Sequence, residues 1–108
     1  MNVNPHEDSP VRLFESPMND GSRAFMDLPT DVIGWGALYR YLGKLDGVTK
    51  TGFLTDRITE VWMDFTYRGH SFSVNTVMGE YWFFVDDPEC PREILKEIAD
   101  HCAQLFEK

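Results

Sequence analysis

Alternating hydrophobic and polar positions in the second half of the chain predict three antiparallel strands. They span residues 58–67, 70–78 and 81–86, and the pairs Arg68-Gly69 and Gly79-Glu80 separate them. Two-residue connections with glycine are typical of β-hairpins. Both hairpins place hydrophobic side chains on one face, which a shift of one residue would turn outward. The expected face consists of Val61, Met63, Phe65, Tyr67, His70, Phe72, Val74, Thr76, Tyr81, Phe83 and Val85.

Hydrophobic residues at helical spacing flank this meander on both sides. The stripe after it comprises Ile94, Leu95, Ile98, Cys102, Leu105 and Phe106, over about four helical turns. The stripe before it comprises Trp35, Leu38, Leu42 and Leu45. Pro29 suits a first helical turn, and Asp46-Gly47 provides a stop. The pattern therefore predicts an α+β fold, αβββα, with a three-stranded antiparallel meander, one helix before it and one helix after it.

Residues 1–24 follow neither a helical nor a strand period. They contain three prolines and many small polar residues, which is typical of a flexible, disordered N-terminal tail. A single α+β domain is expected over residues 25–108, with residues 48–57 as a loop. Within the tail, Val11, Leu13 and Phe14 form a hydrophobic group. This group either stays in solvent, adds a short edge strand to the body, or docks on an exposed patch.

The opposite face of the predicted meander carries more hydrophobic surface than a small monomer usually exposes. Its hydrophobic end gathers Ile58, Trp62, Val77, Trp82 and Phe84. Two interpretations stay open. Either the first helix or the tail covers this face and makes a three-layer domain, or the face is a partner surface or dimer interface, for which tryptophan and phenylalanine are suitable anchors.

Composition and charge restrict the class of partner. The 108 residues are 43% hydrophobic, enough for the core of one domain, and the formal net charge is −8. Such a charge repels phosphate backbones and anionic membrane surfaces, so we expect neither nucleic acid nor membrane as a partner. The chain contains no apolar run of about 20 residues and no signal-peptide pattern at its start, which favours a cytoplasmic location.

The best candidate for chemistry is His70, at the mouth of the first hairpin. Counting along the second hairpin places it opposite Glu89, next to Cys90 near the start of the last helix. A histidine beside a carboxylate and a thiol can support acid–base or thiol chemistry. No phosphate loop, HExxH motif, nucleophile elbow or CxxC pair specifies a reaction, and no metal site or cofactor is expected.

Cys90 and Cys102 are expected to be reduced. They lie twelve residues apart in or beside one predicted helix, about 18 Å at ~1.5 Å per residue. A disulfide requires about 6 Å between the Cα atoms. Both cysteines are therefore interpreted as structural thiols of a reducing compartment.

The run DFTYRGHSFSVNTVMGEYWFFVDDPECP, residues 64–91, resembles small uncharacterised proteins of proteobacteria in which a similar meander precedes a C-terminal helix. The resemblance implies a bacterial α+β protein but brings no activity and no functional residues. In shape and charge the chain is also similar to small acidic chaperones of bacterial secreted effectors and to immunity-type inhibitors of basic toxins.

These observations favour a small acidic, non-enzymatic protein-interaction module. Its aromatic sheet face would bind a protein partner, and the negative charge favours a basic one; a homodimer is also considered. The alternative is a small enzyme or ligand-binding domain that uses the His70 end of the sheet.

Overall fold

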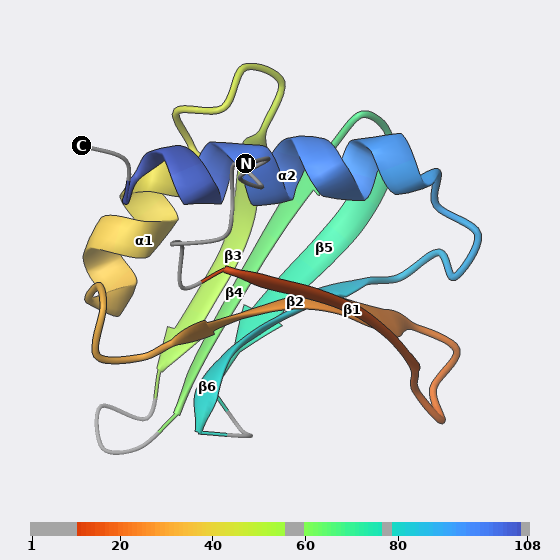
Figure 1. Ribbon diagram of the computed structural model, residues 1–108, viewed down its shortest axis with the longest axis horizontal. Coiled ribbons are helices and arrows are strands. Elements are labelled where there is room, and N and C mark those ends of the chain that lie inside the picture. Colours follow the sequence, from red (N-terminus) through yellow and green to blue (C-terminus); the bar gives the residue numbers. More distant parts are fainter. Residues whose placement is uncertain (1–10, 56–59, 77–78, 107–108) are drawn as a thin grey trace, which may run out of the picture.

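Antiparallel strands of the computed structural model form one sheet, with two helices packed against it (Figure 1). The structure describes residues 11–55, 60–76 and 79–106. Within these ranges the sheet has six strands in the order β1-β2-β6-β5-β4-β3. The strands are β1 (Arg12–Pro17), β2 (Arg23–Pro29), β3 (Thr49–Thr55), β4 (Val61–Tyr67), β5 (His70–Asn75) and β6 (Glu80–Val85), and the helices are α1 (Trp35–Leu42) and α2 (Arg92–Gln104).

The expectation of a three-stranded meander is wrong, because three further strands complete the sheet. The predicted strands correspond to β4, β5 and β6, whereas β1 and β2 extend the sheet beyond β6 and β3 extends it beyond β4. The segment from residue 11 to 24, expected to be part of a disordered tail, instead forms β1 and the beginning of β2. Residues 1–10 lie outside the described residues. The alternative of an edge strand around Leu13 and Phe14 is confirmed.

One face of the sheet, called here the inner face, forms the hydrophobic core with both helices. Tyr67, Phe65 and Met63 of β4 are buried there, and so are Phe72 and Val74, the β5 neighbours of Phe65 and Met63. Two tyrosine hydroxyls on this face reach the segments above it. The Tyr81 hydroxyl donates to the Ile33 carbonyl at 2.7 Å, and the Tyr67 hydroxyl lies 3.2 Å from a Glu97 carboxylate oxygen on α2. The inner face is therefore the helix-covered face.

The last helix matches its prediction closely, and the first is shorter than predicted. In α2 the buried residues are Leu95, Ile98, Ala99, Cys102 and Ala103. In α1 the buried residues are Leu38 and Leu42, and Pro29 ends β2 instead of starting the helix. Neither of the two described helices is both long and apolar enough to cross a membrane.

Candidate functional site

The second face of the sheet, called here the outer face, faces away from both helices (Figure 1). One line of cross-strand neighbours crosses all six described strands on this face. From β3 to β1 it consists of Leu54, Trp62, Asn75, Trp82, Asp27 and Arg12. The line thus combines large apolar side chains towards β3 with a charged pair at β1.

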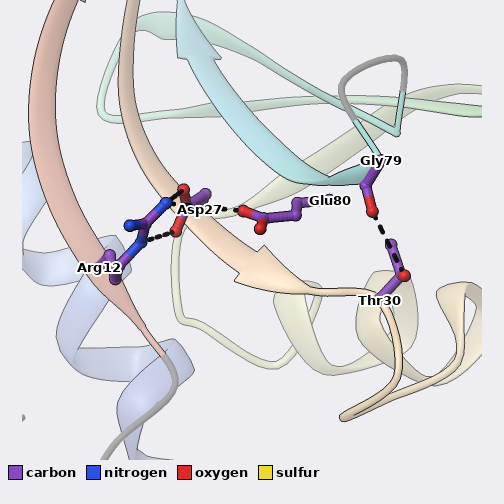
Figure 2. A network of polar contacts seen from close by, with 5 residues as sticks. All are labelled: Arg12, Asp27, Thr30, Gly79 and Glu80. Carbon is purple, nitrogen blue, oxygen red and sulfur yellow. Dashed lines mark hydrogen bonds and ion pairs between the residues drawn. The ribbon is translucent and has the colours of Figure 1, made fainter.

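At the β1 end of this line, a guanidinium covers a buried carboxylate (Figure 2). Asp27 is only 1% exposed, and Arg12 holds it through two bonds: Nε donates to Oδ1 at 2.9 Å, and a terminal nitrogen donates to Oδ2. Glu80 lies 3.7 Å from the same guanidinium. The hydrogen bond to Asp27, followed by that carboxylate's charge, raises the pKa of Arg12. Buried carboxylates need such paired, hydrogen-bonded partners.

An aromatic contact fixes β1 at the same end of the outer face. The ring of Phe14 meets Trp82 edge to face, with centroids 5.1 Å apart. This geometry suits the opposite charges of ring edge and ring face. The Phe14 ring of the N-terminal segment therefore covers part of the aromatic face, whereas α1 lies against the inner face. The three-layer domain, one of the two interpretations left open by the sequence, is therefore not what the described residues form.

Beside the turn between β1 and β2, the outer face contains an open hollow of about 530 Å³, called here the acidic hollow. Strands β4, β5 and β6 form its floor, and the turn between β1 and β2 forms a wall. Its lining residues are Met18, Asn19, Asp20, Ser22, Trp62, Asp64, Ser73, Asn75, Phe84 and Asp86. Three of these described residues are aspartates and none is a lysine or arginine, so the hollow is negatively charged.

Local hydrogen bonds position two of the three aspartates. Asp20 accepts from the backbone N–H of Ser22 at 2.9 Å and from its hydroxyl at 2.6 Å, and these bonds lower the pKa of Asp20. Asp64 accepts from the Ser73 hydroxyl at 2.9 Å. Each carboxylate keeps a free lone pair that another donor can use.

Of the five predicted partner-binding residues, the structure describes three. Trp62, Trp82 and Phe84 share the outer face and are half-buried. Trp62 and Phe84 line the acidic hollow, whereas Trp82 lies nearer β1. Ile58 and Val77 lie outside the described residues. The aspartates around the rings were not predicted as site residues, although Asp20-Gly21-Ser22 is a recognisable turn signal.

At the His70 end, the predicted pairing with Glu89 is wrong. The second hairpin pairs Phe72 with Val85, so the residue brought opposite His70 is Asp87. This residue is two positions before Glu89 in the chain. The His70 Nδ1 atom lies 3.6 Å from an Asp87 carboxylate oxygen. Glu89 is exposed, and its backbone N–H donates to the Asp87 side chain at 2.9 Å. Asp87 thus organises the turn before α2.

The thiols do not have the properties of nucleophiles. Cys90 is 3% exposed, and burial, followed by the charge of Asp87, raises its pKa. Burial raises the pKa of Cys102 to about 12. Both cysteines are free, and a raised pKa keeps each thiol protonated near neutral pH, whereas the thiolate is the reactive form.

Neither a metal centre nor a relative provides a further guide to the site. Among the described residues, no group of three or more His, Cys, Asp or Glu side chains is arranged to hold a metal ion. Comparison with protein-family models, curated proteins and solved structures finds no match for this chain.

Proposed function

We propose that this protein binds a partner protein through the outer face of its sheet. The observation that carries the proposal is the position of Trp62 and Phe84, which are half-buried on a face away from both helices and line an open hollow. Aromatic side chains of this kind dominate the energy of many interfaces. The inner face has no such role, because the helices already cover it.

The charge of the chain favours a basic partner. The net charge is −8, and the acidic hollow contributes Asp20, Asp64 and Asp86 to the contact surface. Opposite charges on two proteins accelerate their encounter and select between partners more than they raise affinity. An escort or an inhibitor of a basic protein would use such a face, and this non-enzymatic role is the one we propose.

The test uses peptides selected from a random display library and titrated into the isotope-labelled protein. We expect the indole N–H signal of Trp62 and the amides of β4 to β6 to shift. Trp62→Ser should abolish binding while the circular dichroism spectrum stays unchanged. The matched control is Trp35→Ser, because Trp35 on α1 is 46% exposed and lies outside the hollow. Shifts that cluster at His70, or equal loss of binding in both variants, would refute the proposal.

A further inference from the structure

The edge strand β1 places two of its side chains over the outer face of the sheet. These side chains are basic and aromatic and lie two positions apart: Arg12 bonds to Asp27, and Phe14 packs against Trp82. The receiving groups are direct cross-strand neighbours, since Asp27 pairs with Trp82. At this end of the face, a carboxylate beside an aromatic ring therefore receives an arginine and a phenylalanine.

The acidic hollow also places carboxylates beside aromatic rings, here two residues apart along one strand instead of across two strands. On β4, Trp62 and Asp64 are two residues apart and so lie on the same face. Phe84 and Asp86 follow the same spacing at the end of β6, and all four side chains line the hollow. None of the described lining residues is a lysine or arginine, so within the described part of the chain no guanidinium covers these carboxylates as Arg12 covers Asp27.

We infer that the acidic hollow binds a partner segment with an arginine and, two positions away, an aromatic or large aliphatic residue. This inference rests on the proposed function and specifies its partner. A guanidinium can bond both oxygens of one carboxylate and stack on a ring at the same time. The ammonium of lysine is a compact charge that cannot bond two carboxylate oxygens in a fixed plane. The hollow should therefore discriminate between the two cations.

The probe is a synthetic peptide, GRLFGRLFG, which repeats the Arg-x-Phe spacing of β1. Two matched peptides replace both arginines by lysine or by uncharged citrulline. We expect the arginine peptide to bind about tenfold more tightly than the lysine peptide, and the citrulline peptide to bind more weakly still. Indole fluorescence measures affinity, and amide shifts map the contact to Trp62, Asp64 and Phe84.

Charge variants of the protein test whether Asp64 and Asp86 cause the preference for the arginine peptide. Asp64→Asn with Asp86→Asn should weaken the arginine peptide by about tenfold or more and remove the difference between the peptides. The control double variant, Asp31→Asn with Asp46→Asn, removes the same charge at exposed positions outside the hollow and should change affinity by less than about twofold.

The contrary outcomes separate this inference from the proposed function. If the citrulline peptide binds equally well and Trp62→Ser still abolishes binding, the arginine preference is wrong and the binding face stands. If library peptides bind the outer face but the arginine peptide does not, the same conclusion follows. If the amide shifts show the peptide replacing β1 at Asp27, the hollow is not the arginine site. If every peptide shifts amides around α1 and β3 instead, both the arginine preference and the proposed binding face are wrong.

Discussion

Tyr41 and His101 hold the two helices together by reciprocal hydrogen bonds. The Tyr41 hydroxyl donates to the His101 carbonyl at 2.6 Å, and the His101 Nε2–H donates to the Tyr41 carbonyl at 2.7 Å. Their rings stack with centroids 4.1 Å apart. The imidazole is therefore held in the tautomer that carries its proton on Nε2. Glu97, one turn before His101 on α2, forms an ion pair with Arg68.

We predict that His101→Phe destabilises the protein by about 1 kcal/mol, the usual net value of one hydrogen bond, with a fall in Tm of about 5 °C. The aromatic ring preserves the stacking on Tyr41, so the loss reports the missing donor. Thermal unfolding followed by circular dichroism measures it. Arg40→Gln, at an exposed position of α1, is the control and should leave Tm nearly unchanged. Equal Tm values for all three proteins would show that the pair has no structural role.

The link between Arg12 and Asp27 should determine how firmly β1 is attached. Arg12→Met leaves the buried Asp27 carboxylate without its guanidinium, so the urea midpoint should fall and the amides of β1 should exchange faster with solvent. Arg92→Met is the matched control, since Arg92 pairs with Glu15 at 2.8 Å where both side chains are exposed. That variant should behave almost like the parent. Equal effects of the two substitutions would contradict a special role for Asp27.

Alkaline pH should destabilise the protein through its buried thiols. The unfolded Cys102 ionises near its ordinary pKa of 9.0, whereas the folded one ionises only at about 12. Between these values the unfolded state binds fewer protons, so the free energy of unfolding falls as pH rises. Burial raises the pKa values of Cys90, Tyr39 and Tyr81 as well, which acts in the same direction.

Urea unfolding at about pH 7 and about pH 10 measures this effect. Cys102→Ala should reduce the change in the free energy of unfolding between these pH values. The variant should be less stable at both pH values because of the cavity it creates. A thiol reagent at neutral pH should modify neither cysteine rapidly until urea is added. Fast modification of the native protein, or a midpoint that rises with pH, would contradict the burial of the thiols.

The free edge of β3 should promote self-association at high concentration. Phe53 and Leu54 on this edge strand are 40% and 64% exposed, and Trp35 packs against Phe53 with centroids 5.0 Å apart. Exposed hydrophobic edge strands tend to pair with other chains. Leu54→Lys should reduce the mass seen by light scattering at high concentration without lowering Tm. An unchanged mass would show that this edge does not associate, and a lower Tm would show that Leu54 supports the fold.

The sequence predicted the first hairpin correctly because its turn is unambiguous. Arg68 and Gly69 both have positive φ, 50° and 80°, as the two-residue turn requires, and Tyr67 pairs with His70 as expected. The second turn is longer, since the Gly79 N–H bonds to the Thr76 carbonyl and only Gly79 among its described residues has a positive φ. Treating it as a two-residue turn shifted the pairing by two residues and misplaced the partner of His70.

The missed strands lack the alternation that identifies a strand. In β2 every residue from Ala24 to Leu28 is buried, including Asp27, so inward and outward positions cannot be distinguished. In β3 an irregularity between Lys50 and Gly52 interrupts the period, and the Tyr39 hydroxyl donates to the Gly52 carbonyl there. The acidic hollow could not be predicted without these strands, because the turn between β1 and β2 forms its wall.

The order of the strands also determines when the sheet can be completed during synthesis. Strand β2 pairs with β6, although Thr30 and Gly79, which meet at the end of that pairing, are 49 residues apart in the chain. The β1–β2 hairpin is synthesised early, and the edge of β2 that pairs with β6 therefore stays unpaired until β6 leaves the ribosome. Such long-range closure slows folding and leaves intermediates prone to aggregation. The N-terminal hairpin is thus the part of this protein that would benefit most from a chaperone during translation.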